Sequence, residues 1–301
     1  SIHPRLSADV FRRFTWWLMA VFLWIYYISP CIRWDRGECL PDQAVLVDLA
    51  HRWFFFFFIA IWPQEFYYVA CMLIMAGVGL FLVTSILGRA WCGYACPQTV
   101  FIEMFFRPIE RLVEGSGPKR AKLQKSPWGV EKVFKRGLKW FLFLLVSLHI
   151  THSGIGYFVG THNLLKISMQ SPSENLYLFT LMAFCTAVIL LDFGWFREQF
   201  CIIACPYGRI QSIAMDENSL IVGYDQKRGE PRRRTAGISK EEEGDCVNCN
   251  RCVNVCPTGI DMRDGLQMEC IASTRCIDAC DDTMIKTKQE NGHVGNTMET
   301  K

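Results

Sequence analysis

Four long apolar stretches are the feature that most constrains how this chain can fold. They run from Phe14 to Ile32, from Phe66 to Leu87, from about Leu138 to Val159 and from Leu176 to Trp195. About 20 mostly apolar residues are enough to cross a bilayer as a helix. Because lipid offers no hydrogen-bond partners, a spanning segment must satisfy its backbone internally. The sequence therefore predicts an α-helical membrane protein with about four transmembrane helices in a lipid bilayer.

A fifth apolar run, from Trp53 to Trp62, is too short to span a membrane and ends at Pro63. We interpret it as an interfacial or re-entrant piece.

Basic residues predict the orientation of the helices, because Lys and Arg accumulate in cytoplasmic loops. The segment from Gly88 to Lys139 carries eleven of them, whereas the segment from Tyr157 to Asn175 carries only Lys166. With four spans, both termini and the basic segment then lie in the cytoplasm. We interpret the basic stretch from Lys119 to Lys139 as a contact with anionic lipid head groups, and not as a nucleic-acid site.

Two helical hairpins of the membrane part are each followed by the same short motif, Cys-x3-Cys-Pro. The copies are GRAWCGYACPQTVF and REQFCIIACPYGRI, with matching residues 109 positions apart. Soft thiolates suit Cu(I), zinc or an iron–sulfur cluster, whereas a single pair of apolar cysteines is usually packing. Because the two copies match, we predict a catalytic metal or redox site that holds copper or a third cluster. Its residues are Cys92, Cys96, Cys201 and Cys205.

The polar region after the last apolar stretch contains a specific metal-binding motif. From Cys246 it reads CVNCNRCVNVCP, with the spacing Cys-x2-Cys-x2-Cys-x3-Cys-Pro. This is the bacterial ferredoxin run, whose fourth cysteine ligates the other of two clusters. Zinc sites prefer two separated pairs of cysteines, and disulfides are rare in the cytoplasm. The motif predicts a small α+β, bacterial-type two-cluster ferredoxin domain.

A second run, CIASTRCIDAC, lacks one cysteine because position 273 is serine. Crossed ligation assigns four cysteines to the first cluster: Cys246, Cys249, Cys252 and Cys280. The second cluster takes Cys256, Cys270 and Cys276, and its fourth position falls on Ser273. We therefore predict one intact [4Fe-4S] cluster and a second that is altered or labile. The second could be a three-iron cluster, a four-iron cluster with an oxygen ligand, or no stable cluster.

These motifs divide the chain into four predicted segments. The membrane domain covers residues 1–223, a charged linker 224–245, the ferredoxin-like domain 246–285 and a polar tail 286–301. Within the third apolar stretch, His149 and His152 are spaced to share one helical face. Polar residues within membranes are often functional, but the sequence leaves the role of this pair open.

Together, these motifs resemble those of the FixG/RdxA/CcoG family, accessory proteins of cbb3-type cytochrome c oxidase related to the NapH and NosR polyferredoxins. The resemblance covers about residues 15–285 and includes YDQKRGEPR and GDCVNCNRCVNVCPTGIDMRDGLQMEC. It implies a multi-pass iron–sulfur protein of the bacterial inner membrane, with its ferredoxin domain in the cytoplasm. It also implies an oxidoreductase that reduces Cu(II) to Cu(I) for oxidase assembly. Ser273 departs from the two complete cysteine runs of the family.

The same resemblance implies partners: a cytoplasmic electron donor, and copper-delivery proteins or oxidase assembly factors. The alternative is a NapH-like conduit that oxidises quinol without copper chemistry. A structural assembly scaffold with vestigial clusters is a third interpretation.

Overall fold

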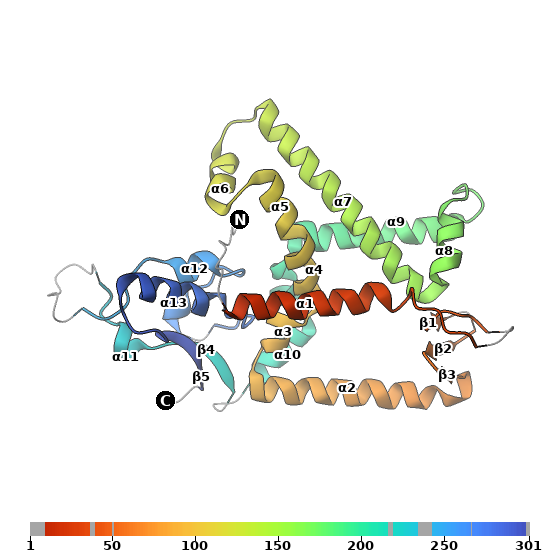
Figure 1. Cartoon of the computed structure of the whole chain (residues 1–301), viewed down its shortest axis with the longest axis horizontal. Coiled ribbons are helices and arrows are strands. Elements are labelled where there is room, and N and C mark those ends of the chain that lie inside the picture. The colour runs from red at the N-terminus through yellow and green to blue at the C-terminus, as the bar shows by residue number, and fades with distance from the viewer. Residues whose placement is uncertain are drawn as a thin grey trace.

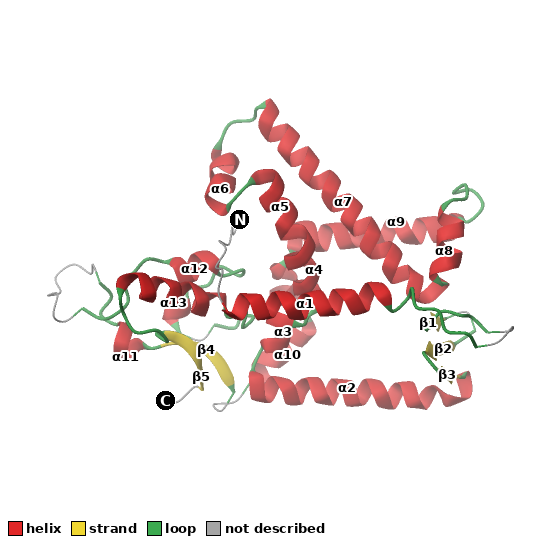
Figure 2. Ribbon diagram, viewed as in Figure 1, coloured by secondary structure: helices red, strands yellow, loops and turns green. Residues whose placement is uncertain are grey.

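The structure is a computed structural model that describes residues 10–36, 40–49, 51–215, 219–233, 243–265 and 267–298. Most of these residues are helical (Figure 2). Long helices fill one part of the molecule, and a compact unit of short helices with a two-stranded sheet forms the other (Figure 1). This arrangement confirms the predicted fold class, a helical membrane protein that carries a ferredoxin-like unit.

Three of the described helical segments are long and apolar enough to cross a bilayer. They are η1 (Pro63–Glu65) with α2 (Phe66–Leu87), then α7 (Val130–Val159), then α9 (Leu176–Leu191) with η3 (Asp192–Phe196). Most of their side chains are not buried inside the protein. An apolar surface of this kind is suited to contact with lipid tails.

The first apolar stretch forms helix α1 (Val10–Ile28), which begins with Arg12 and Arg13 near its start. α1 is not among the three segments that meet the length and hydropathy of a span within the described residues. Its Met19 and Leu23 side chains pack into the helical core. The count of four transmembrane helices therefore stays a prediction.

The short apolar run from Trp53 to Trp62 forms part of a β-sheet. Strands β1 (Val45–Asp48), β2 (Trp53–Phe56) and β3 (Ile59–Ile61) pair antiparallel in the order β1-β2-β3. The run is therefore part of a β-hairpin and not a re-entrant piece, so that interpretation is wrong. Its aromatic and β-branched residues favour strands. Phe57 has a left-handed φ of 49° at the turn.

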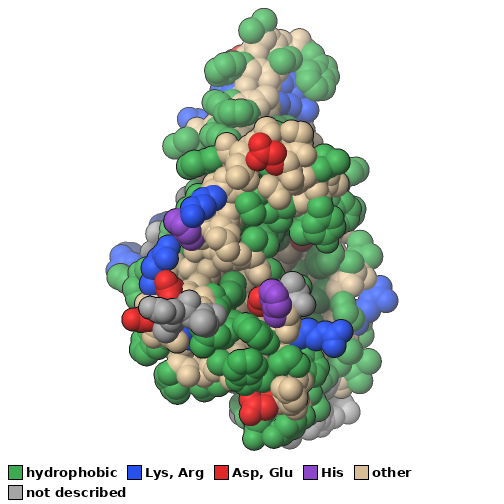
Figure 3. All heavy atoms as spheres, turned by 90° about the vertical axis from the view of Figure 1, so that its right-hand side faces the viewer, with side chains coloured by type: hydrophobic (Ala, Val, Ile, Leu, Met, Phe, Trp, Pro, Cys, Tyr) green, Lys and Arg blue, Asp and Glu red, His purple; other side chains and the backbone are tan. Residues whose placement is uncertain are grey.

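The end of the molecule that carries this sheet exposes large aromatic side chains, including Trp34, Phe58 and Trp62. Seen from that end, hydrophobic side chains mix with scattered charged and histidine side chains (Figure 3). Such mixed aromatic surfaces are typical of the membrane–water interface.

Short helices follow each of the two hairpins, and one more connects the two long helices of the second hairpin. They are α3 (Ala90–Tyr94), α4 (Pro97–Phe101), the π-helix η2 (Ile102–Phe106), α5 (Arg107–Glu114), α6 (Gly117–Lys125), α8 (Thr161–Ser168), the π-helix η4 (Phe200–Ala204) and α10 (Pro206–Ala214). The core joins α1, α4, η2, α7 and η3 through stacked aromatic rings, notably Phe101, Phe106, Phe143 and Phe193.

The ferredoxin unit contains α11 (Gln226–Gly229), α12 (Arg251–Val255), η5 (Met262–Asp264) and α13 (Arg275–Thr287). It is closed by β4 (Leu220–Tyr224), which pairs antiparallel with β5 (Val294–Met298). Met262, Ile277 and Val294 form its core.

The structure draws the domain boundaries differently from our prediction. β4 lies in the segment assigned to the membrane domain, and β5 lies in the segment assigned to a polar tail. The described part of the predicted linker also packs onto the unit, because Arg233 N donates to Cys246 O at 2.9 Å. Pairing between strands about 70 residues apart leaves no local signal in the sequence. Residues 234–242 of the predicted linker lie outside the described residues.

Candidate functional site

The four cysteines predicted for the first cluster line a single cavity in the ferredoxin unit. They come from the loop before α12, from α12 and from α13: Cys246, Cys249, Cys252 and Cys280. Asn248 and Asn250 adopt left-handed conformations, with φ of 51° and 55°, which asparagine tolerates better than most residues. Four thiols around one cavity are the donor set of a [4Fe-4S] cluster, so the residues fit this group.

Arg263 holds this loop in shape. Its Nη1 donates to Asn248 Oδ1 at 3.0 Å, and its Nη2 donates to Asn250 Oδ1 at 2.7 Å. Its Nε donates to Asp261 Oδ1 at 2.8 Å. Because both left-handed residues are tied to one guanidinium, the loop is preorganised around the cavity.

The environment of the four thiols is uneven. Burial raises the pKa of Cys252 to about 11 and that of Cys280 to about 12. Burial also raises the pKa of Cys246, but the neighbouring His293 side chain and the backbone amide of Asn248 outweigh it, so this pKa falls to about 7. Thiols ligate iron as thiolates, so cluster binding must displace protons from the buried pair.

The three cysteines predicted for the second cluster are also close neighbours. Burial raises the pKa of Cys276, and the thiolates of Cys270 and Cys256 raise it further. Cys256 Sγ lies 3.2 Å from Thr258 Oγ1. The structure therefore brings together residues from both runs, as crossed ligation requires.

Ser273 stands in the second loop where Cys249 stands in the first. Its neighbours Ala272 and Thr274 have φ of 50° and 53°, matching the two asparagines of the first loop. Left-handed backbone is uncommon for Ala and is an outlier for a β-branched residue such as Thr. The second loop thus keeps a cluster-binding backbone at a conformational cost.

The second loop lies directly against α3, the helix that carries Cys92. A Cβ on Gly93 would lie 2.7 Å from Ile271 O and 2.8 Å from Ala272 O, so only glycine permits this approach. The Tyr94 hydroxyl also hydrogen-bonds to Thr274 Oγ1. The ferredoxin unit and the first Cys-x3-Cys-Pro motif are therefore in contact.

The four cysteines of the two Cys-x3-Cys-Pro motifs converge after α2 and α9. Cys92 and Cys201 are buried in α3 and η4, while Cys96 and Cys205 precede the prolines that begin α4 and α10. These prolines start helices because their fixed φ suits the first helical position. Burial, followed by the other three thiolates, raises the pKa of Cys201 to about 12.

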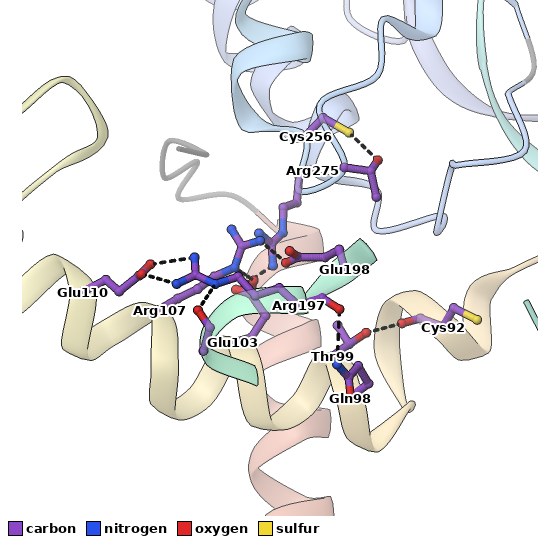
Figure 4. Close-up of polar contacts among 12 residues, drawn as sticks. Cys92, Gln98, Thr99, Glu103, Arg107, Glu110, Arg197, Glu198, Cys256 and Arg275 are labelled. Atoms are coloured by element: carbon purple, nitrogen blue, oxygen red, sulfur yellow. Dashed lines mark hydrogen bonds and ion pairs between the residues drawn. The ribbon is translucent and has the colours of Figure 1, made fainter. Parts of the chain in front are cut away.

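A buried polar chain surrounds Cys92. Its Sγ donates to Gln211 Oε1 at 3.0 Å, and Gln211 Nε2 donates to Thr84 Oγ1 at 3.3 Å. Thr84 Oγ1 lies 2.9 Å from the Tyr207 hydroxyl. Thr99 Oγ1 donates to the backbone carbonyl of Cys92 at 2.6 Å (Figure 4). These hydrogen bonds link the two Cys-x3-Cys-Pro motifs, because Tyr207 and Gln211 lie on α10, which follows the second motif.

Among the described residues, no three His, Cys, Asp or Glu side chains are close enough to hold a single metal ion. The copper or third-cluster site at the membrane cysteines stays a prediction. His149 and His152 lie on α7, and His149 stacks on Tyr27 with ring centroids 5.0 Å apart. Within the described part of the chain, no third His, Cys, Asp or Glu side chain completes a metal site with this pair.

An ionic network that the sequence analysis did not identify joins the ferredoxin unit to the helical part (Figure 4). Buried Glu103 pairs with Arg107 Nε and Arg275 Nη2, each at 2.6 Å. Burial opposes ionisation of Glu103, but these two arginines lower its pKa to about 2. Arg107 and Arg197 extend the network to Glu198 and Glu110. In the sequence, the i, i+4 spacing of Glu103 and Arg107 could have indicated one ion pair of this network.

Comparisons with known proteins agree with this geometry. The 4Fe-4S dicluster domain family matches residues 196–299, which span the ferredoxin unit with β4 and β5. The 4Fe-4S binding domain family matches residues 69–115, which include Cys92 and Cys96. No solved structure matches the chain. The fold and the cysteine sites define an iron–sulfur electron-transfer protein of the membrane.

The relatives make the identification more specific. The chain is 49% identical to the nitrogen fixation protein FixG of Rhizobium meliloti over 97% of its length, covering 56% of that protein. It is 48% identical to RdxA and to RdxB of Cereibacter sphaeroides, each over 98% of its length and 62% of theirs. The chain belongs to the FixG/RdxA/CcoG family. It spans less than two thirds of the length of these relatives.

Proposed function

We propose that the chain relays electrons from a cytoplasmic donor, through its ferredoxin unit, to the four membrane cysteines, where Cu(II) is reduced to Cu(I). One observation carries this proposal: the loop of the second cluster touches the helix that holds Cys92, at Gly93. Electrons cross short, packed contacts between redox centres, and glycine brings these two backbones as close as they can come.

The residues of the relay have separate tasks. Two sets of cysteines would each hold a cluster that supplies one-electron transfer when bound: Cys246, Cys249, Cys252 and Cys280, and then Cys256, Cys270 and Cys276 with Ser273. Arg89 is buried between the second loop and α3, and its positive charge acts on both Cys92 and Cys270. A cation between two thiolate-rich sites favours the arrival of negative charge at either.

Copper enters this proposal as a substrate. The soft thiolates of Cys92, Cys96, Cys201 and Cys205 favour Cu(I) over Cu(II). Each Cu(II) takes one electron and becomes Cu(I), while a reduced electron-transfer protein in the cytoplasm loses one electron. The product would pass to copper-delivery proteins or oxidase assembly factors of a cbb3-type oxidase.

The proposed orientation places the ferredoxin unit in the cytoplasm and the chain in a bacterial inner membrane. It is supported by the eleven basic residues between Gly88 and Lys139, because cytoplasmic loops carry such an excess. An accessibility assay in intact cells tests it, with single cysteines placed at Ser116 and Ser173, which the proposal puts on opposite sides.

A single-turnover experiment tests the reaction. The anaerobically purified chain in detergent is reduced by dithionite, freed of excess reductant and mixed with Cu(II), and a colorimetric Cu(I) chelator counts the copper reduced. We expect about one Cu(I) per stored electron for the parent chain, and at least a tenfold slower rate for Cys92→Ser and Cys201→Ser. Their ferredoxin EPR spectra should be unchanged. Cys71→Ser, which alters an exposed thiol of α2, is the matched control.

Two results would contradict the proposal. If the serine variants reduce copper at the parent rate, the membrane cysteines are not the reaction site. If a quinol analogue reduces the clusters quickly while reduced protein leaves Cu(II) untouched, the chain is a quinol-oxidising conduit instead.

A further inference from the structure

His293 is a deeply buried ionisable side chain that the proposed relay does not use. It lies directly before β5, and its side chain is 1% exposed. Neither ring nitrogen has a hydrogen-bond partner among the described residues. A buried imidazole must carry at least one N–H, and leaving that donor unpaired is costly. The sulfur of Cys246 is the candidate partner, because it lines the same cavity and the His293 side chain lowers its pKa.

The ring faces the cavity of the first cluster. His293 lines it together with the four cysteines Cys246, Cys249, Cys252 and Cys280. Tyr224, the last residue of β4, packs edge-on against the imidazole with ring centroids 4.8 Å apart. The ring thus lies between the β4–β5 sheet and the thiols.

Glycine at position 229 makes room for the imidazole. A Cβ there would lie 2.4 Å from His293 Cε1 and 2.5 Å from Nε2. The backbone of His293 is also fixed, because its carbonyl accepts a hydrogen bond from Asp225 N at 3.1 Å. Three segments, the end of β4, α11 and the start of β5, therefore hold the ring in one place.

We propose that His293 donates a hydrogen bond to a sulfur of the first cluster, at or beside Cys246, and so raises the reduction potential of that cluster. Hydrogen bonds to cluster sulfurs withdraw negative charge and favour the reduced state. His293 is a positioning residue in this role, and it makes the first cluster the better electron acceptor in the relay. The inference rests on the proposed function only in assigning a cluster to these four cysteines.

The second loop offers a contrast within the same chain. This loop lies against α3, Cys270 lies near Arg89, and none of Cys256, Cys270 and Cys276 lines the cavity that His293 faces. His293 should therefore act on one cluster and leave the other unchanged.

The test is a redox titration of the full chain in detergent, followed by EPR at constant pH. The signal lost in Cys249→Ala identifies the first cluster. We expect His293→Leu to move its midpoint to more negative potential, while His293→Gln, which keeps an N–H donor, stays near the parent value. The second signal should not move in either variant. His51→Leu, at the exposed turn between β1 and β2, is the control.

A second measurement needs no variant. Parent protein with ¹⁵N-labelled histidine should show a weakly coupled nitrogen in pulsed EPR of the reduced first cluster. The absence of that coupling, or an unchanged midpoint in His293→Leu at equal iron content, would overturn the inference. If the parent chain holds no cluster at these cysteines, the proposed relay itself fails, which is a distinct result.

Discussion

The two cysteine loops of the ferredoxin unit share a backbone but not an environment. Asn248 and Asn250 in the first loop, and Ala272 and Thr274 in the second, all have φ between 50° and 55°. Between each pair stands the residue that differs, Cys249 in one loop and Ser273 in the other. The second loop thus has the backbone geometry of the first, although serine stands in place of one cysteine ligand.

The difference between the loops lies in what holds them. Arg263 hydrogen-bonds to both asparagines of the first loop, inside the ferredoxin unit. The second loop depends on the helical part, through Gly93 and Tyr94 of α3 and the pair between Arg275 and Glu103. Changes at this junction should therefore affect the second cluster and spare the first.

The largest expected effect tests whether ligation is crossed between the runs. Cys280 belongs to the second run but lines the first cavity. Cys280→Ala should abolish the same EPR signal as Cys249→Ala and lower the iron content by about one cluster, because a cluster needs its thiolates. Cys71→Ala should change neither. Loss of the signal that depends on Cys276 instead would show that each run binds its own cluster.

The second-largest expected effect is a gain of bound iron. Ser273→Cys places a thiol in a backbone that already matches that of Cys249, so a full set of four thiolates should form. Iron per chain should rise to that of two four-iron clusters, and the second EPR signal should become resistant to air. Ser173→Cys adds a thiol at an exposed position and should bind no iron. Iron in Ser273→Cys that stays below the content of two four-iron clusters would mean that the second loop is not a cluster loop.

Glu103 tests the ionic attachment of the second loop. Its pKa in the folded chain is about 2, below its ordinary value of 4.5. A depressed pKa means stability that is present above about pH 4.5 and is lost as the pH falls toward 2. Glu103→Gln should cost about 3 kcal/mol at pH 7, because the buried Arg107 and Arg275 lose the carboxylate that they share.

Unfolding in detergent measures this effect. The difference between the parent chain and Glu103→Gln should shrink between pH 7 and pH 3, and the second cluster should be lost before the first. Glu131→Gln, which removes an exposed carboxylate, should match the parent at every pH. An equal loss of both clusters would show that Glu103 supports the whole unit.

Gly93 carries the smallest expected effect. Gly93→Ala puts a methyl group within 2.8 Å of two carbonyl oxygens of the second loop, so one backbone must shift. We expect a cost of about 2 kcal/mol, a slower electron transfer to the membrane cysteines and an unchanged first cluster. Gly77→Ala, with nothing within 4 Å of the added atom, is the control. If Gly93→Ala transfers electrons to the membrane cysteines at the parent rate, this contact is not part of the relay.

Local sequence patterns were enough to predict the parts of the molecule that are built from residues close together in the chain. Apolar length predicted α2, α7 and α9, and cysteine spacing predicted the ferredoxin unit. The hairpin at Trp53–Ile61 escaped prediction, because its short aromatic run shows neither a helical nor a strand period over enough residues. β5 escaped prediction as well, since its partner β4 precedes it by some 70 residues.

By itself, the sequence determined which residues can bind metal and which stretches can enter lipid, because thiol chemistry and apolar length are properties of single segments. Only the tertiary structure decided that the loop with Ser273 lies against α3, that Arg89 lies between two thiol sites and that His293 faces the first cavity. These contacts join residues far apart in the chain. They form because folding buries apolar surface throughout the molecule, and no local pattern records which surfaces meet.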